Sequence, residues 1–287
     1  MAEAKIGVIG GSGLYHIEGL TDVQETKIKT PFGEPSDAIT LGKLEGVEVA
    51  FLPRHGRGHR LSPTEVPSRA NIYALKSLGV ERIIAVAAVG SLKEKIKPMD
   101  IVIPDQIIDR TRNRVNTFFG GGIVSHIAFA EPFCPVLSDI LYESAHETGA
   151  RVHDGGTCII MEGPQFSTRA ESELYRSWGA DIIFMTALPE AKLAREAEIC
   201  YATIAIVTDY DCWNETVESV STEMIIFNLL KSVGTAKQII KLAVTRLPQT
   251  RDCLCANALK NTIATSPELI PEQVKKDLKL IIGEYIK

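Results

Sequence analysis

Short apolar stretches rich in isoleucine and valine alternate along this chain with longer, mixed stretches. The short stretches have the length of β-strands, and several are apolar at every position, as in a sheet covered by helices on both faces. We expect strands at Lys5–Ile9, Val47–Leu52, Arg82–Val89, Ile101–Ile103, Thr157–Met161, Ile182–Met185 and Ala202–Thr208. This alternation predicts one α/β domain with a largely parallel sheet.

Glycines close three of the longer stretches, which we interpret as helices. Gly79, Gly149 and Gly179 follow them directly, and glycine readily takes the left-handed conformation that ends a helix. Thr168 and Glu171 are spaced as a capping box at a helix start. The expected helices are Ser68–Leu78, Val136–Thr148, Arg169–Trp178, Glu190–Glu198 and Thr222–Arg246.

The main body is expected to end near Pro248. Residues 1–248 then form the principal domain, and residues 249–287 form a helical extension packed on it. Two helices are expected in this tail, at Leu254–Ile263 and Glu272–Ile286, separated by prolines.

Charge and length restrict the function classes. The 287 residues include 31 Lys and Arg against 36 Asp and Glu, a net charge of −5. That balance argues against a nucleic-acid or membrane-surface partner for the protein as a whole, and it is compatible with a local basic pocket for a small anion. No apolar run is long enough to cross a bilayer, and no signal peptide is recognisable, so we expect a cytoplasmic protein.

Two glycine-containing loops follow strands and are candidates for binding an anion. Gly10-Gly11-Ser12-Gly13 follows the first strand, where backbone N–H groups and the Ser12 hydroxyl can surround an anion; the alternative is a tight turn. A dinucleotide fingerprint is disfavoured, because His16 stands where its third glycine is required. The second loop runs Arg54-His55-Gly56-Arg57-Gly58-His59-Arg60. Its arginines suit phosphate, because the planar guanidinium makes two charge-assisted hydrogen bonds to such an anion. The alternatives are a solvated basic loop or a metal site, and no ligand cluster accompanies the histidines, so we expect no metal.

Three further segments end strands. The first runs Ala87-Ala88-Val89-Gly90-Ser91, and its small side chains leave room either for a ligand or for close packing of the strand on a helix. The second runs from Met161 to Thr168 and contains Phe166 and Ser167. These two residues either contact a flat base or belong to the core and the helix cap. Asp209 and Asp211 are two residues apart after a strand, so they can share a face and converge on one ligand, or they are solvated turn residues. Paired carboxylates often have raised pKa values.

These loops, in this order, resemble the 5′-methylthioadenosine phosphorylase family of purine nucleoside phosphorylases. The resemblance extends from Lys5 to about Pro248. The segments that carry it are Gly10–Gly13, Thr30–Gly33, Arg54–Arg57, Gly90–Leu92, Asp109–Thr111, Ala130–Cys134, Glu162–Pro164, Arg169–Ser172 and Thr208–Trp213.

The resemblance implies a three-layer α/β/α sandwich with a mixed, partly barrel-like sheet, and a homotrimer or a dimer of trimers. It also implies site residues. Phosphate would be held by Ser12, Arg54, His55, Ala87, Ala88 and Thr186; the nucleoside by Met185, Phe166, Ser167, Asp209, Asp211, His59, Thr222 and Ile226, with His126 from a neighbouring subunit. Family members often have Thr where this chain has Ala87, and the polar Thr222 departs from an aliphatic position.

The implied reaction is phosphorolysis of 5′-methylthioadenosine to adenine and 5-methylthioribose 1-phosphate, with adenosine as a second candidate substrate, phosphate as co-substrate and no cofactor. We expect Asp209 to protonate adenine N7, and Asp211 to set the pKa of Asp209 and to bond toward the 6-amino edge of the base. Two carboxylates suit the 6-amino group of adenine, whereas Asn suits a 6-oxopurine. The alternatives are a 6-oxopurine nucleoside phosphorylase, a dinucleotide-dependent oxidoreductase and a non-catalytic nucleoside-binding module.

Six cysteines leave two hypotheses open. Cys134, Cys158, Cys200, Cys212, Cys253 and Cys255 are either free thiols, or some of them form a disulfide that ties the tail to the body or joins Cys253 to Cys255.

Overall fold

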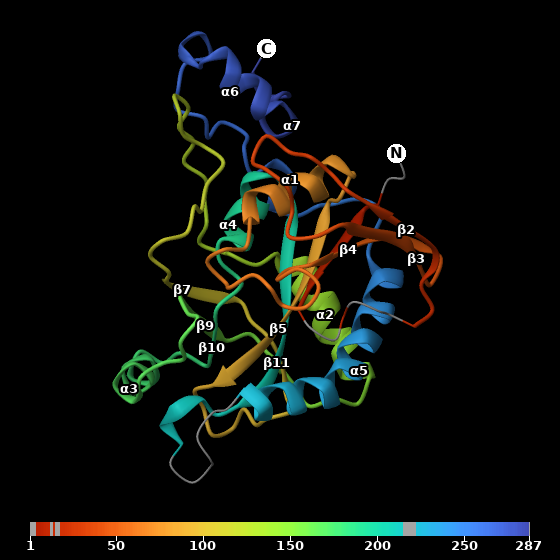
Figure 1. Cartoon of the computed structure of the whole chain (residues 1–287), viewed down its shortest axis with the longest axis vertical. Coiled ribbons are helices and arrows are strands. Elements are labelled where there is room, and N and C mark those ends of the chain that lie inside the picture. Colours follow the sequence, from red (N-terminus) through yellow and green to blue (C-terminus); the bar gives the residue numbers. More distant parts are fainter. Residues whose placement is uncertain (1–3, 12–13, 15–17, 215–221, 287) are drawn as a thin grey trace.

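A mixed β-sheet of eleven strands forms the centre of the molecule in a computed structural model that describes residues 4–11, 14, 18–214 and 222–286 (Figure 1). The strands are β1 Ile6–Gly10, β2 Thr21–Thr26, β3 Ile39–Leu44, β4 Val47–Pro53, β5 Arg82–Ser91, β6 Ile101–Ile103, β7 Gln106–Arg110, β8 Val152–Asp154, β9 Thr157–Met161, β10 Ile182–Phe184 and β11 Cys200–Asp209. The helices are α1 Ser68–Ser77, α2 Pro135–Glu147, α3 Arg169–Ser177, α4 Glu190–Glu196, α5 Thr222–Arg246, α6 Glu272–Asp277 and α7 Lys279–Ile282.

Strand β5 is the junction of the sheet. The main path runs β2-β3-β4-β1-β5-β10-β9-β7, and β11 pairs with β5 and β6 off that path. Strand β5 is therefore parallel to both β1 and β11 along its first half, and its last two residues pair antiparallel with β10. The sheet is therefore mixed, as the resemblance implies, and less uniformly parallel than the alternation of elements predicts.

Two apolar cores lie on opposite faces of the sheet. Helices α1 and α4 contribute Leu75 and Leu193 to one core, and α2 and α5 contribute Leu141 and Ile240 to the other. Side chains of β5 and β11 are buried along nearly their whole length, as covered strands must be. The result is the predicted α/β/α arrangement in three layers.

All seven predicted strands are present, with ends within two residues of the prediction. Four other strands were missed. Strand β2 is polar and exposed, β8 has three residues, and β3 and β7 carry polar residues among apolar ones, so none has a continuous apolar pattern.

The five predicted helices of the body are also present. The capping box is confirmed: the Thr168 side chain accepts from the Glu171 backbone, and the Glu171 side chain accepts from the Thr168 backbone. Gly79, Gly149 and Gly179 all have positive φ at the helix ends. The local signals at the helix ends therefore agree with the fold.

The prediction of two long helices in the tail is wrong. Leu254–Asn257 forms only a 3₁₀ turn, and Asn261 has a φ of +61°, which prevents a helix from continuing there. The second stretch is divided into α6 and α7. This part of the tail still buries Ile270, Leu278 and Ile282 against the core that contains α1, and Figure 1 shows α6 and α7 beyond α1, far from α3.

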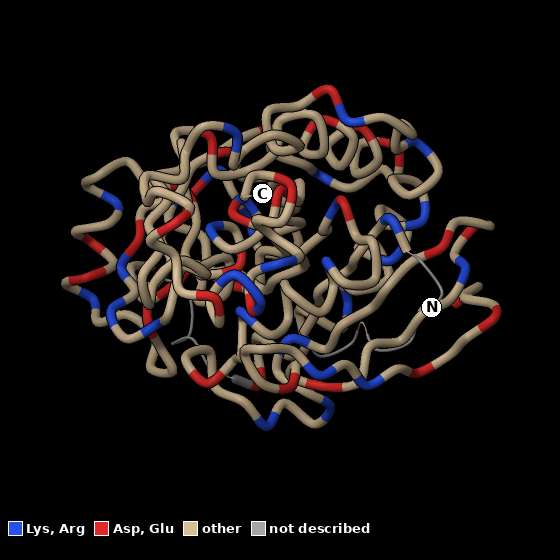
Figure 2. The backbone as a smooth tube through the Cα atoms, turned by 90° about the horizontal axis from the view of Figure 1, so that it is seen from above, with Lys and Arg blue, Asp and Glu red and all other residues tan. Residues whose placement is uncertain are grey.

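Charges of both signs are interspersed along the described backbone (Figure 2). In the described part of the chain, no helix combines the length and the apolarity that a bilayer span requires.

Candidate active site

A cavity of about 570 Å³ opens at the ends of strands β4, β5, β10 and β11. Open α/β sheets place ligands at the carboxyl ends of their strands. Most of the residues that sequence analysis singled out line this one cavity: Arg54, His55, His59, Ala87, Ala88, Phe166, Met185, Thr186, Asp209, Asp211 and Ile226.

Four residues named from the sequence are not among the cavity-lining side chains. Ser12 lies outside the described residues, and Thr222 begins α5 but its side chain is likewise outside them. Ser167 lies beside the cavity, where its carbonyl accepts from the Cys212 thiol. His126 is exposed, and its backbone N–H donates to Thr262.

Arg54 follows β4 and is buried with a carboxylate partner that sequence analysis missed. Its Nε donates to Oε1 of Glu190 at 2.5 Å, and its Nη2 donates to Oε2 at 3.1 Å. The Tyr201 hydroxyl donates to the same carboxylate at 2.9 Å. Although burial opposes the charge, Glu190 raises the pKa of Arg54 above its ordinary value. The fork expected to hold phosphate is therefore directed at Glu190.

The other arginines of the basic loop are also balanced by carboxylates. Arg57 donates to Glu25 at 2.6 Å, and Arg60 lies 3.5 Å from Asp37. These acidic partners are 20 or more residues away in the chain, so the local charge run could not reveal them. The loop consequently carries less uncompensated positive charge than its composition indicates.

His55 is neutral at physiological pH. Burial and the Arg54 charge lower its pKa to about 4. Its Nδ1 lies 2.9 Å from the Leu61 carbonyl, and because a carbonyl only accepts, Nδ1 carries the proton. Nε2 is then an acceptor. The His59 ring stacks on the His55 ring, with centroids 4.3 Å apart.

Asp209, the last residue of β11, is the most perturbed carboxyl of the cavity. Burial raises its pKa to about 6. Oδ1 accepts from the Asp211 backbone at 2.8 Å and Oδ2 accepts from the Thr208 hydroxyl at 2.7 Å, which hold the group in place. Gly90 makes this possible, because a Cβ there would lie 3.0 Å from Asp209 Oδ1. The small residues at the end of β5 therefore make room for a carboxyl.

Asp211 opens the 3₁₀ turn Asp211–Trp213 and is also buried. Its φ of +51° is unusual for a residue other than glycine, and the Asp209 bond to its N–H holds this conformation. Burial raises the pKa of Asp211 as well. The structure therefore brings two carboxyls with raised pKa values to one end of the cavity.

Met185, just after β10, is held in place by a second arginine that sequence analysis missed. Arg114 donates to the backbone carbonyls of Met185, of Leu188 at 2.6 Å and of Glu162 at 2.5 Å. Gly163 permits the approach of Met185, because a Cβ there would overlap the Met185 sulfur. One buried guanidinium thus fixes the loops that follow β9 and β10. Arg114 is a single arginine in an irregular stretch, so the sequence gave no signal of this role.

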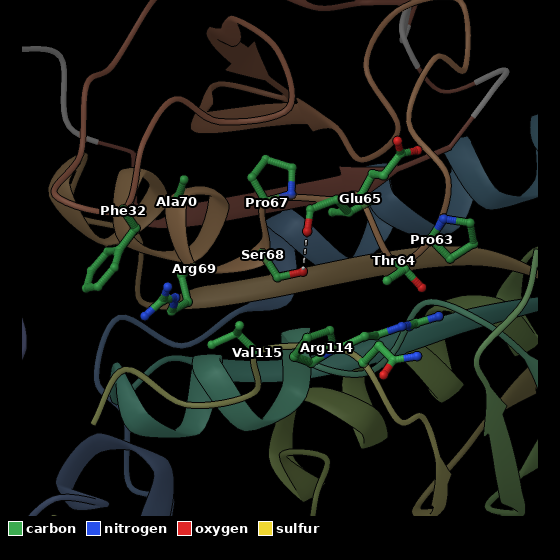
Figure 3. A pocket seen from close by; sticks show the side chains of 13 residues that line it. Phe32, Pro63, Thr64, Glu65, Pro67, Ser68, Arg69, Ala70, Arg114 and Val115 are labelled. Carbon is green, nitrogen blue, oxygen red and sulfur yellow. Dashed lines mark hydrogen bonds between the residues drawn. The ribbon is translucent and has the colours of Figure 1, made fainter. Parts of the chain in front are cut away.

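A second, smaller cavity of about 250 Å³ borders the first, and Pro63 lines both. Figure 3 shows Thr64 and Arg114 near each other at one end, with Phe32 and Arg69 at the other. The Arg69 guanidinium lies 4.8 Å from the centre of the Phe32 ring. The segment around Pro63 therefore separates the main cavity from this one.

One wall of the main cavity is apolar and comes from α5. Ile225, Ile226, Leu229 and Leu230 line it. Their spacing follows one face of a helix, a signal from which the full wall could have been predicted. Asn228 donates to the Thr208 carbonyl at 2.7 Å, which ties α5 to the strand end that carries Asp209.

Comparison with known proteins places the chain in a family. The family model for the phosphorylase superfamily matches residues 5–245. An S-methyl-5′-thioadenosine phosphorylase from Geobacter sulfurreducens is 60% identical over 99% of this chain and 100% of its own length. One from Chloroflexus aurantiacus is 56% identical over 99% of each chain.

Solved structures agree with these relatives. A methylthioadenosine phosphorylase from an antarctic soil metagenomic library has a TM-score of 0.94 and 51% identity, covering 98% of this chain and 99% of its own. A mutant adenosine/methylthioadenosine phosphorylase from Schistosoma mansoni, in complex with methylthioadenosine, has a TM-score of 0.81 and 35% identity over 98% of each chain. The chain therefore belongs to the phosphorylase superfamily and, within it, to the S-methyl-5′-thioadenosine phosphorylase family.

Proposed function

We propose that this chain cleaves the N9–C1′ bond of 5′-methylthioadenosine with inorganic phosphate, giving adenine and 5-methylthioribose 1-phosphate. The observation that carries the assignment of roles is Asp209, a buried carboxyl of raised pKa that lines the same cavity as Arg54 and His55. The Schistosoma mansoni relative with bound methylthioadenosine supports the choice of substrate.

At the base end, Asp209 donates its proton to adenine N7. With a pKa of about 6, roughly one Asp209 in ten is protonated at pH 7, against about one in a thousand for an ordinary aspartate. Protonation draws electrons from the N9–C1′ bond and makes adenine a better leaving group. Asp211 accepts a hydrogen bond from the 6-amino group, which a 6-oxopurine lacks.

At the opposite end, phosphate is held by neutral and backbone groups around one compensated cation. Arg54 donates four bonds to Glu190, Val86 and Ile9, and its second Nη1 N–H is the donor that we assign to phosphate. Thr186 and Ser12 supply hydroxyl donors. Nε2 of neutral His55 accepts the hydroxyl of HPO₄²⁻, leaving the ionised oxygens to face C1′.

Between the base end and the phosphate end of the proposed site, the ribose lies over Met185 and the base contacts Phe166 and Ser167. As C1′ gains positive charge, the phosphate oxygens stabilise it and attack. The residues contribute positioning and electrostatic stabilisation. His59, Thr222 and Ile226 surround the 5′ position, and His126 comes from a neighbouring subunit of a homotrimer or of a dimer of trimers. The only co-reactant is phosphate.

The apolar face of α5 favours the methylthio group over a hydroxyl. We expect Ile226→Thr to lower the ratio of kcat/KM for methylthioadenosine over adenosine by about tenfold, the usual effect of one altered methyl contact. The control is Phe227→Thr, which changes an exposed residue of the same helix outside the cavity lining. Equal ratios in both variants would exclude Ile226 from the 5′ site.

The deciding experiment is chromatographic measurement of adenine release from methylthioadenosine, with and without phosphate. We expect release that depends on phosphate and yields a sugar phosphate. Inosine in the same assay tests the 6-oxopurine alternative, which would give hypoxanthine at a comparable rate. Nucleoside binding with no release of base would instead indicate a binding module and end the proposal.

A further inference from the structure

Four of the six cysteines meet at one point away from the active-site cavity. The sulfur atoms of Cys134, Cys200, Cys253 and Cys255 all lie within 4.8 Å of one another. They come from three parts of the chain: the residue before α2, the first residue of β11, and the Cys-x-Cys segment of the tail. Three are buried, and Cys253 is partly exposed.

The separations suit four ligands around one ion. A tetrahedral zinc ion with Zn–S bonds of about 2.3 Å holds its sulfur atoms about 3.8 Å apart. The Cys200 and Cys253 sulfurs are 3.3 Å apart, and no separation in the cluster exceeds 4.8 Å, so the observed range includes that value. A disulfide requires about 2.05 Å, and all four residues are free thiols in the structure.

One helix end at the cluster suits a negatively charged ligand. Cys134 precedes the first turn of the thirteen-residue helix α2, where the helix dipole favours a negative charge. Soft thiolate ligands are those that zinc prefers in structural sites.

Backbone contacts that do not involve the thiols hold the ligands in place. The Cys134 N–H donates to the Tyr201 carbonyl at 2.8 Å, which fixes two ligand-bearing segments together. Arg82 donates to the Pro248 and Thr250 carbonyls at 2.6 and 2.9 Å, which holds the start of the tail. Arg251 donates to the Glu198 carbonyl at 2.5 Å. The four sulfurs are therefore brought together by the fold itself.

We propose that Cys134, Cys200, Cys253 and Cys255 bind one zinc ion that cross-links the tail to the start of β11 and to α2. Four protein ligands close the coordination sphere, so the site is structural. Binding releases the thiol protons to solvent and forms four Zn–S bonds with a net charge of −2 on the cluster, which the buried Arg195 partly offsets. The sequence offered only thiols or disulfides, because a single Cys-x-Cys gives no sign of Cys134 and Cys200.

The first test uses the full-length protein, reduced, stripped with a chelator and kept without oxygen. We expect it to retain about one zinc per chain after incubation with zinc and desalting, as measured by mass spectrometry of the metal. Cobalt in place of zinc should give the intense visible bands of tetrahedral thiolate coordination. A reduced protein that retains no zinc, or that gives only the weak cobalt bands of octahedral coordination, overturns the proposal.

The second test uses variants. Cys200→Ser and Cys255→Ser should lose the stoichiometric zinc, whereas Cys158→Ser, which changes a buried cysteine outside the cluster, should keep it. Because the tail has contacts that need no thiol, the variants should fold, which circular dichroism can check. Zinc retained by both cluster variants overturns the proposal.

Disulfides are the competing outcome. Alkylation before and after reduction, followed by peptide mass spectrometry, identifies any bridge among the four cysteines in the protein as purified. A bridged protein that takes up no zinc once reduced contradicts the proposal, and one that then binds one zinc per chain supports it. Hydrogen exchange of residues 249–287 should slow when zinc is added to the stripped protein.

Discussion

Arg54 and Asp209 are both charged residues buried against the same cavity, and they differ in compensation. Arg54 has the Glu190 carboxylate at 2.5 Å and keeps its charge. Asp209 has a hydroxyl, a backbone N–H and a second carboxyl nearby, but no cation among its hydrogen-bond partners, and its pKa rises to about 6. A compensated group serves as a fixed positive charge, whereas an uncompensated carboxyl can exchange a proton near neutral pH.

The largest expected effect comes from removing the exchangeable proton. Asp209→Asn keeps the size of the side chain and one acceptor oxygen, and should lower turnover of methylthioadenosine by about 10²- to 10⁴-fold, the usual contribution of a positioned general acid. Steady-state adenine release at saturating phosphate measures it. Ser172→Ala, which alters a buried neighbour of the turn, should remain within about tenfold of the wild type. Unchanged turnover in Asp209→Asn would remove the residue from the mechanism.

The second prediction breaks the compensated pair. Glu190→Ala leaves the Arg54 charge buried without its carboxylate and should lower the free energy of unfolding by about 3–5 kcal/mol. Denaturation in urea measures this. Glu25→Ala, which breaks the exposed pair with Arg57, should cost no more than about 1 kcal/mol. Equal losses in the two variants would mean that burial does not distinguish these pairs.

The third prediction concerns the stability of Asp209→Asn, which should rise although the activity of this variant falls. Its folded pKa of about 6 exceeds the ordinary value of 3.8, so ionisation opposes folding, and the cost grows as pH rises from about 4 and is complete above about 6. A difference of about two pKa units corresponds to roughly 3 kcal/mol. Asp209→Asn should therefore gain up to that amount at pH 7.5.

The control for this gain in stability is the same measurement at acid pH. Near pH 4, Asp209 is protonated in the folded chain and about half protonated in the unfolded chain, so most of the advantage of the Asn variant should be lost there. Urea denaturation at pH 4 and at pH 7.5 gives both values. A gain that is the same at the two pH values would show that it does not come from the buried charge.

The charged residues that line the cavity could be predicted from the sequence, but the carboxylate that compensates Arg54 could not. Asp209 and Asp211 lie at the end of the strand that positions them, and Arg54 follows a strand of its own, so each could be recognised as a strand-end candidate, and the family resemblance grouped the three in one site. Glu190 lies 136 residues from Arg54, inside a helix whose pattern looks ordinary. Partners that only folding brings together leave no local signal.

The same reason explains Arg114 and the cysteines. Arg114 acts by donating to carbonyls of residues at least 47 positions away, and backbone acceptors carry no sequence signature at all. Cys134 and Cys200 approach the Cys-x-Cys segment only once α2, β11 and the tail have packed. Strand ends and caps are local properties that periodicity reveals, whereas charge balance and ligand sets depend on the tertiary fold.

The smallest expected effect sharpens the comparison at the phosphate end. Because the Arg54 charge is already compensated, an added neutral donor should contribute measurably there. Ala87 lines the cavity from β5, and Ala87→Thr should lower KM for phosphate by about two- to tenfold, the contribution of one added hydrogen bond, while KM for methylthioadenosine changes little. Ala87→Val has the same shape without the hydroxyl and should raise KM for phosphate or leave it unchanged. If Val and Thr act alike, shape at this position matters and phosphate does not contact residue 87.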